Sequence, residues 1–142
     1  MKAKVFFFDK HSIDLKQVKY LVMVPYYKGK LVVVRHRERT TWEMPGGHRE
    51  PGEGCEEGAR RELMEETGAT RFQLHWLTAY SVTWNGKTEY GQLFRAEIEE
   101  LGKLPEYEIA EVRLVDKLPE NLTYPMIQPA MLHKVLEMND AC

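Results

Sequence analysis

The alternation of hydrophobic and polar residues predicts several strands in the first third of the chain. The segments Lys4–Phe8 and Lys19–Tyr27 are rich in Val, Phe and Tyr, which is typical of strands. The second segment is hydrophobic on both faces, and this favours a central position in a sheet. The turn at Lys28–Lys30 leads into another β-branched segment, Leu31–Val34, so we expect a hairpin. A polar loop then separates this hairpin from a short extended piece at Trp42–Met44.

Two longer segments in the second half predict a second hairpin. Phe72–Trp84 and Thr88–Ile98 are rich in aromatic and β-branched residues and are joined through an Asn-Gly pair, a strong hairpin-turn sequence. The charged stretch Glu97–Glu108 contains Gly and Pro and is expected to be a surface loop. Glu111–Val115 alternates between polar and hydrophobic residues, as an edge strand or a half-buried strand does.

Two other segments predict helices. Glu56–Thr67 has no proline and is rich in good helix formers, and a loop rich in Gly and Pro precedes it. Leu118–Pro129 carries three prolines and is expected to be irregular at its start. Hydrophobic residues then recur at helical spacing in Ala130–Met138, which predicts a terminal helix docked on the sheet. Together these elements predict an α+β or mixed α/β fold, with helices layered on a sheet.

Length and composition limit the classes of function. With 142 residues, 43% of them hydrophobic, we expect a single domain over residues 1–142. The net charge of −2 gives no reason to expect a nucleic acid polymer or a membrane as partner. The two cysteines, Cys55 and Cys142, form neither a disulfide framework nor a zinc-binding pattern. No hydrophobic segment is long enough for a signal sequence or a membrane span, so we expect a cytoplasmic protein.

Three carboxylates share one face of the helix predicted at Glu56–Thr67. Glu62, Glu65 and Glu66 are spaced i, i+3, i+4, so their side chains fall within an arc of about 100°. Like charges at this spacing destabilise an isolated helix, and a bound cation would relieve them. Glu53, in the preceding loop, is close enough in sequence to join. No His or Cys stands at a ligand spacing with these residues, so Mg²⁺, Mn²⁺ or Ca²⁺ is expected rather than Zn²⁺.

A divalent ion held by carboxylates keeps open positions that can bridge phosphate oxygens. It would neutralise a pyrophosphate, which bare glutamates would repel, and lower the pKa of an attacking water. A remaining carboxylate could accept the proton of that water. The cluster therefore predicts hydrolysis of a phosphate anhydride.

The glycine, glutamates and arginine of this region resemble the complete signature of the Nudix hydrolase family. Gly47 is followed after five residues by Glu53, and after seven more by the segment Arg61–Ala69. The preceding Trp42–Gly47 is similar to the stretch that leads into this signature. Ala69 stands where a larger aliphatic residue is usual and Gly58 where Ala is common, and both differences affect packing rather than ligands.

The resemblance implies an α/β/α sandwich around a mixed, partly antiparallel sheet. It implies Mg²⁺-dependent hydrolysis of a nucleoside diphosphate linked to another group, with Mn²⁺ as an alternative ion. The implied site consists of Glu62, Glu65 and Glu66 as metal ligands, the Gly47 carbonyl as a further ligand, Glu53 as a ligand or part of the base network, and Arg61 orienting a glutamate. Many relatives add a downstream glutamate, for which Glu108 and Glu111 are the candidates.

The substrate is decided outside the signature. A nucleoside triphosphate, including an oxidised one, is the leading hypothesis, and ADP-ribose or another nucleotide sugar is the alternative. A nucleotide-binding module without catalysis is the competing class, although four intact glutamates argue against it. Arg35 and Arg37 are candidates for phosphate binding, with a solvated loop as the alternative. Asn121 or Tyr124 is the candidate for base binding, with a turn as the alternative for Asn121. Homodimers are common among relatives, so a homodimer stays an open alternative.

Overall fold

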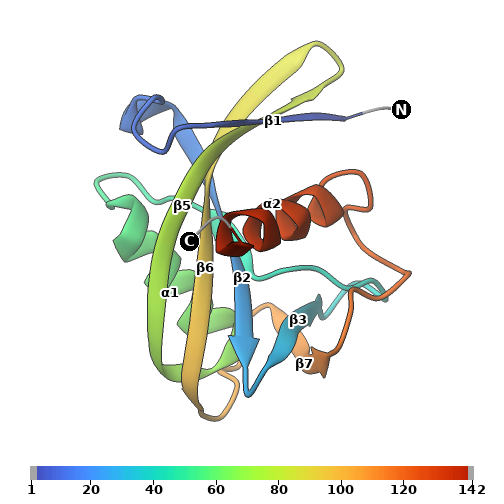
Figure 1. Ribbon diagram of the computed structural model, residues 1–142. Coiled ribbons are helices and arrows are strands. Elements are labelled where there is room, and N and C mark those ends of the chain that lie inside the picture. The colour runs from blue at the N-terminus through green and yellow to red at the C-terminus, as the bar shows by residue number, and fades with distance from the viewer. Residues whose placement is uncertain (1–2, 141–142) are drawn as a thin grey trace.

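A seven-stranded mixed sheet with an α-helix on each face forms the part of the chain that the computed structural model describes, residues 3–140 (Figure 1). The strands are β1 (Lys4–Phe8), β2 (Val18–Tyr27), β3 (Lys30–His36), β4 (Gly46–His48), β5 (Ala69–Trp84), β6 (Lys87–Leu101) and β7 (Ile109–Val115). The helices are α1 (Cys55–Thr67), α2 (Gln128–Asp140) and a short 3-10 helix at Leu15–Gln17.

The central strand of the sheet is β2, as its hydrophobic character on both faces predicted. The order is β1-β5-β6-β2-β3-β7, and β2 and β6 are parallel whereas the other pairs are antiparallel. On its other edge β2 is shared by two partners, because Tyr20–Val22 pair with β4 and Tyr26–Tyr27 pair with β3. This division brings the glycine-rich β4 into the sheet beside α1.

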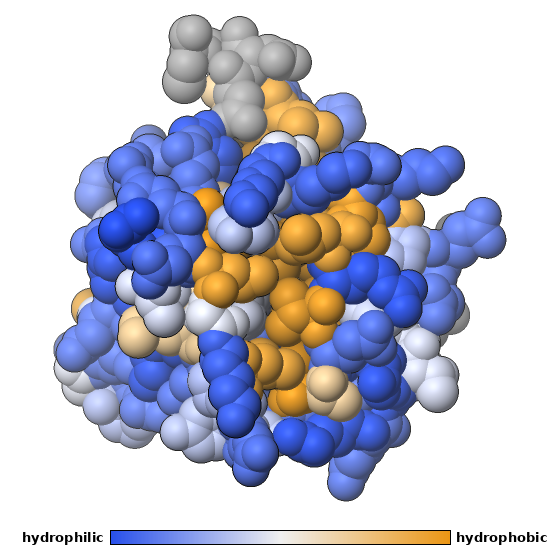
Figure 2. Space-filling model, turned by 90° about the horizontal axis from the view of Figure 1, so that it is seen from below, coloured by the Kyte–Doolittle hydropathy of each residue, from blue (hydrophilic) through white to orange (hydrophobic). Residues whose placement is uncertain are grey.

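Both faces of the sheet are hydrophobic, and each is covered by a helix. On one face Cys55, Ala59 and Leu63 of α1 pack against the sheet at intervals of four residues. On the other face Met131 and Val135 of α2 pack against β2 and β3. This arrangement confirms the predicted α/β/α sandwich. At the end of the molecule opposite β1, hydrophobic side chains reach the surface between hydrophilic borders (Figure 2).

The long β5–β6 hairpin extends further than the sequence predicted. The stretch Glu97–Glu108 was expected to be a surface loop, and this is wrong for its first five residues, which belong to β6. Ile98 of that stretch is buried in the core, whereas Glu99 points outward and forms an ion pair with Arg71 of β5 at 3.0 Å. Buried and exposed residues alternate there as in a strand, but the glutamates make this alternation hard to recognise from the sequence.

The terminal helix α2 begins two residues earlier than predicted, at Gln128. The Gln128 side chain is buried, and its Oε1 accepts a hydrogen bond from the Met44 backbone N–H at 2.7 Å. This bond fixes the start of α2 against the extended piece that precedes β4. Within residues 3–140, neither α-helix has the length and apolar character needed to cross a membrane.

Gly68 ends α1 in the left-handed region, with φ at 80° and its N–H donating to the Met64 carbonyl at 3.1 Å. A Cβ at this position would lie 2.9 Å from the Gly102 and Lys103 carbonyl oxygens, so the glycine is required by both conformation and space. Gly29 has nearly the same φ, 79°, but no atom lies within 4 Å of the place that a Cβ would occupy there.

We therefore predict that Gly68→Ala lowers the free energy of unfolding by about 3 kcal/mol, through both strain and steric overlap. Gly29→Ala is the matched control and should cost only the conformational strain, about 1 kcal/mol. Urea denaturation of both variants measures this difference, and equal losses would contradict the close approach of the α1 end to the Gly102 loop.

Candidate active site

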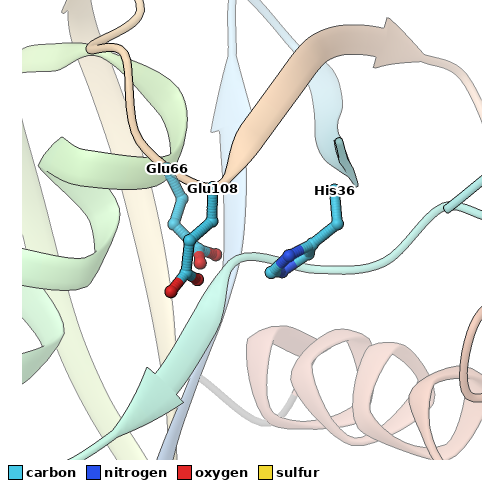
Figure 3. A group of neighbouring side chains, drawn as sticks. All are labelled: His36, Glu66 and Glu108. Carbon is cyan, nitrogen blue, oxygen red and sulfur yellow. The ribbon is translucent and has the colours of Figure 1, made fainter. Parts of the chain in front are cut away.

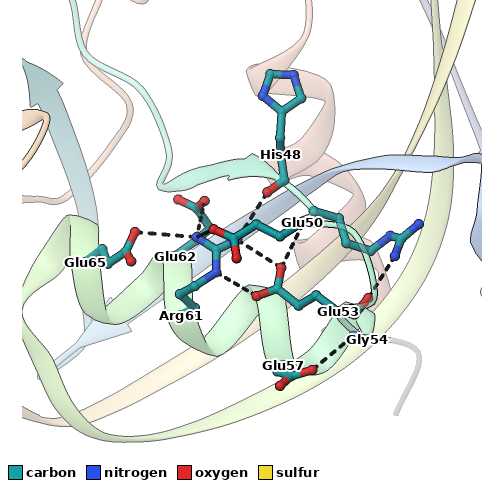
Figure 4. Close-up of polar contacts among 9 residues, drawn as sticks. His48, Glu50, Glu53, Gly54, Glu57, Arg61, Glu62 and Glu65 are labelled. Carbon is teal, nitrogen blue, oxygen red and sulfur yellow. Dashed lines mark hydrogen bonds and ion pairs between the residues drawn. The ribbon is translucent and has the colours of Figure 1, made fainter.

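One guanidinium, that of Arg61 on α1, holds the acidic residues of the site together (Figure 4). Its Nε and Nη2 donate to the two carboxylate oxygens of Glu53 at 2.6 and 2.9 Å. Its Nη1 lies 2.9 Å from Glu62 Oε1 and 3.5 Å from Glu65 Oε2. Nη2 also donates to the His48 carbonyl at 3.2 Å. The helix, the preceding loop and β4 are thus joined through one side chain.

Glu53 is buried beneath Arg61, and both of its oxygens are engaged. Oε1 also accepts from the Glu50 N–H at 3.0 Å, and the contact with Arg61 holds the pKa of Glu53 below its usual value. A Cβ on Gly58 would lie 2.6 Å from Glu53 Oε1 and 2.5 Å from Leu21 Cδ1. Gly58 therefore provides the space in which Glu53 lies, which explains a glycine inside α1.

Glu62 approaches the β4 backbone so closely that only glycine fits opposite it. A Cβ on Gly47 would lie 2.6 Å from Glu62 Oε1. Burial raises the pKa of Glu62, with further contributions from the negative charges of Glu65 and Glu108, while Arg61 opposes the shift. The Gly47 backbone and the Glu62 carboxylate are therefore side by side, as ligands of one ion must be.

Glu66 is the most deeply buried carboxylate of the three on α1, with 5% of its surface exposed. Its Oε1 accepts a hydrogen bond from the Gly46 N–H at 2.9 Å. Burial raises the pKa of Glu66 to about 8, and the nearby carboxylates of Glu62, Glu43 and Glu108 add to the shift. A cation beside Glu66 would reverse this effect, because it stabilises the charged form.

The three clustered carboxylates of α1 line one part of a cavity of about 1090 Å³. Glu62, Glu65 and Glu66 line it together with Arg61 and Gly47, so the structure brings these predicted residues to one surface. Other parts of the lining are aromatic or uncharged, namely Tyr20, Tyr80, Trp84, Tyr124 and Gln128. A cavity with a carboxylate cluster and aromatic side chains suits a ligand that combines phosphates, an ion and a ring.

The two downstream glutamates lie in different surroundings. Glu108 lines the cavity and faces Glu66 (Figure 3). Glu111 does not line the cavity, and its carboxylate lies 3.5 Å from Arg35 Nε and 3.3 Å from Arg113 Nη2. The geometry therefore favours Glu108 over Glu111 as the additional site residue.

Of the residues proposed for phosphate or base contacts, Tyr124 lines the cavity, whereas Arg35, Arg37 and Asn121 lie outside its lining. Arg35 donates to the Arg39 carbonyl at 3.0 Å, and Arg37 donates through Nε to the Tyr107 carbonyl at 2.7 Å. Asn121 donates through Nδ2 to the Thr40 carbonyl at 3.0 Å. Arg37 and Asn121 each join two loops, whereas Arg35 lies in β3 and contacts the loop that follows it. Their roles in substrate binding stay predictions, and the geometry gives them no support.

Sequence reasoning did not single out several polar residues that line the cavity, among them Glu43, Arg39 and His36. Glu43 has 7% of its surface exposed and accepts from Arg39 Nη1 at 2.9 Å. His36 Nε2 lies 3.8 Å from Glu43 Oε2. The one sequence signal for Glu43 was its position as a lone carboxylate between the hydrophobic residues Trp42 and Met44. That segment was predicted only to be extended.

His36 also approaches two carboxylates of the site. Potential ligand atoms of His36, Glu66 and Glu108 all lie within 4.8 Å of one another, and the three side chains converge from β3, α1 and the segment before β7 (Figure 3). The sequence placed no histidine at a ligand spacing, because His36 is far along the chain from α1. Strand pairing, rather than spacing within one element, brings it there.

Comparisons with known proteins agree with this geometry. A family model described as the NUDIX domain matches residues 17–130. YtkD of Bacillus subtilis, a proposed 8-oxo-dGTP diphosphatase, is 38% identical over 106 residues, which cover 74% of this chain and 66% of YtkD. An ADP-ribose pyrophosphatase of Bacillus subtilis is 39% identical over 93 residues, covering 60% of this chain and 50% of the relative. This chain therefore spans half to just under two thirds of these curated relatives.

The fold is also similar to that of a solved structure. The crystal structure of the Bacillus subtilis pyrophosphohydrolase BsRppH superposes with a TM-score of 0.79 at 31% sequence identity. The superposition covers 96% of this chain and 90% of that one. A second likeness, to the Ap4A hydrolase of C. elegans, has a TM-score of 0.69 at 21% identity and concerns the fold alone.

The raised pKa of Glu66 predicts how the metal-free protein responds to pH. Between about 4.5 and about 8 the folded state binds more protons at Glu66 than the unfolded state does. The free energy of unfolding should therefore fall as the pH rises through this interval, by up to about 1.4 kcal/mol per unit. Urea denaturation in EDTA at several pH values measures the slope. Glu66→Gln should have a smaller slope, and an unchanged slope would contradict the burial of this carboxylate.

Arg61 makes a second prediction for stability. Arg61→Lys cannot reproduce the paired contact with Glu53 and leaves a buried carboxylate poorly paired, so the free energy of unfolding should fall by about 3 kcal/mol. Arg60→Lys is the matched control, because the neighbouring Arg60 is exposed and lies 3.6 Å from Glu56. Its effect should stay within about 0.5 kcal/mol. Similar losses in the two variants would show that Arg61 has no special structural role.

Proposed function

This chain belongs to the Nudix family, and we propose that it hydrolyses the pyrophosphate linkage of a nucleotide by attack of water on phosphorus. The observation that carries this proposal is the position of Glu62, Glu65 and Glu66 on one wall of a cavity that also has aromatic residues in its lining. Three adjacent carboxylates suit a reaction in which a divalent ion is held beside phosphates.

The residues present fit a divalent ion such as Mg²⁺ or Mn²⁺. Glu62 lies directly against Gly47, so its carboxylate and the Gly47 carbonyl are available from neighbouring elements. The donors are carboxylate and carbonyl oxygens, which hard divalent cations prefer. When bound, such an ion would neutralise the pyrophosphate and lower the pKa of the attacking water.

The protein groups divide into those that position and those that face the substrate. Glu53 lies outside the cavity lining and is saturated by Arg61 and the Glu50 N–H, so we assign it to positioning rather than to direct ligation. Because Arg61 also contacts Glu62, it fixes the position of the Glu62 carboxylate relative to Glu53. Proton acceptance from the attacking water then falls to a carboxylate that lines the cavity, with Glu65 and Glu108 as the candidates.

A nucleoside triphosphate, including an oxidised one, is the substrate class that we propose first. The similarity to YtkD supports it, and aromatic side chains such as Tyr20 and Trp84 can stack on a nucleobase. ADP-ribose is the second candidate, on the similarity to an ADP-ribose pyrophosphatase. Binding without catalysis is disfavoured, because a pure binder does not need the complete set of carboxylates.

We further propose that residues 1–142 act as one domain in the cytoplasm on small-molecule nucleotides. A homodimer stays a prediction. The cavity lining includes residues from β2, β4, α1, β5 and the segment before β7, so one chain supplies all the lining groups named above.

Release of phosphate or pyrophosphate from dGTP and 8-oxo-dGTP, and of AMP and ribose 5-phosphate from ADP-ribose, with Mg²⁺ and then with Mn²⁺, tests the proposal. Glu65→Gln should lower kcat at least about 100-fold, the scale of a lost general base or metal ligand. Glu56→Gln is the matched control, because Glu56 is an exposed residue of the same helix and does not line the cavity. Activity retained in full by Glu65→Gln would reject the site, and inactivity on every nucleotide would favour a binding module.

A further inference from the structure

The β3 strand directs His36 toward α1. Alternate residues of a strand face the same side of the sheet, and Val32 of β3 is buried in the hydrophobic cluster that includes α1. His36 lies four residues further on, at the end of the strand, and therefore has the same orientation. The β3–β7 register shifts between Arg35 and His36, and such irregularities commonly redirect a side chain beside a functional site.

The segment before β7 is fixed next to His36 by main-chain contacts. The Arg37 backbone N–H donates to the Glu108 carbonyl at 2.9 Å, and Arg37 Nε donates to the Tyr107 carbonyl at 2.7 Å. These two bonds hold Tyr107 and Glu108 next to the end of β3. Glu108 is therefore held close to His36 by the backbone, even though its own side chain is exposed.

Glu66 is the third residue of the group with His36 and Glu108, and one of its two carboxylate oxygens is available to a ligand. Its Oε1 is occupied by the Gly46 N–H, whereas no donor contacts Oε2 within the described residues 3–140. Oε2 is not among the buried side-chain atoms that lack a partner in the described residues, so it keeps contact with the cavity that Glu66 lines. This oxygen is therefore the one that a cation beside Glu66 would meet.

We propose that His36, Glu66 and Glu108 bind a divalent transition-metal ion, and that His36 thereby gives the metal centre a nitrogen ligand. Ligands on opposite sides of an ion stand about 4.2 Å apart at a bond length of about 2.1 Å. Ligand atoms that already lie within 4.8 Å of one another need only small side-chain movements to reach this arrangement. The inference rests on the proposed metal site but not on which nucleotide is cleaved.

The nitrogen ligand changes which ion the site prefers. Mg²⁺ is satisfied by carboxylates and water, whereas first-row transition ions gain affinity from an imidazole. The carboxylates of α1 alone would accept Mg²⁺ and Mn²⁺ with little distinction. With His36, the same centre should bind Mn²⁺ or Co²⁺ more tightly than Mg²⁺.

Glu43 lies beside the His36 ring, at ion-pair rather than hydrogen-bond distance. Metal-binding histidines commonly direct the second ring nitrogen to a carboxylate, which fixes the ring orientation. Glu43 Oε2 lies 3.8 Å from His36 Nε2. Because Arg39 already forms an ion pair with Glu43 at 2.9 Å, His36 is not needed to neutralise this buried carboxylate.

Pulsed EPR of the full chain loaded with Mn²⁺ tests the inference without any measurement of hydrolysis. The wild-type protein should show hyperfine coupling between Mn²⁺ and a nitrogen nucleus, and His36→Asn should lose it. His133→Asn is the matched control, because His133 is exposed on α2 and does not line the cavity. Titration should show Mn²⁺ affinity about tenfold weaker in His36→Asn, with Mg²⁺ affinity, measured by competition, changed less than about twofold.

The possible failures can be told apart. If wild-type protein binds Mn²⁺ without nitrogen coupling, the role of His36 is wrong while the carboxylate site and the proposed function survive. Coupling that persists in His36→Asn, or equal loss of Mn²⁺ and Mg²⁺ affinity, also rejects ligation by His36. If no Mn²⁺ binds at all, both the inference and the proposed function fail. The wild-type spectrum decides the point even if the variant does not fold.

Discussion

The contact of Arg61 with Glu53 and Glu62 is the interaction on which the candidate site depends. Several carboxylates on one helix and its preceding loop would repel one another, and the guanidinium provides the compensating charge inside the protein itself. It satisfies Glu53 completely and Glu62 in part, and leaves Glu66 to the Gly46 N–H. Arg61 thereby holds these side chains in one arrangement, which reduces the reorganisation that ion binding would require.

The fold supports this arrangement by dividing one edge of β2 between β3 and β4. In β4, the Gly46 N–H bonds to Glu66 and the Gly47 backbone lies against Glu62. A side chain would meet the Leu21 carbonyl at Gly46 and the Glu62 carboxylate at Gly47. His36 lies at the end of β3. Glu108 comes from the segment before β7, whose backbone is hydrogen-bonded to Arg37. The site therefore lies where helix, split sheet edge and loop meet.

The parts of this structure that depend on local pattern were predictable from sequence. The face shared by Glu62, Glu65 and Glu66 follows from helical spacing, and the central position of β2 follows from its hydrophobic residues. The positions of Glu43, His36 and Glu108 relative to α1 were not predictable, because they depend on long-range strand pairing and a register shift. The end of β6 at residues 99–101 was missed because its polar residues are glutamates, and Glu99 forms a cross-strand contact with Arg71.

Anomalous diffraction from a crystal grown with Mn²⁺ and a non-hydrolysable nucleotide tests the central claim most directly, namely that these carboxylates gather around divalent ions that hold a pyrophosphate. The account predicts anomalous peaks at bonding distance from Glu62, Glu65 and Glu66, with phosphate oxygens of the nucleotide on the other side of each ion. Nucleotide bound elsewhere on the protein, with no peak among these three side chains, would contradict it.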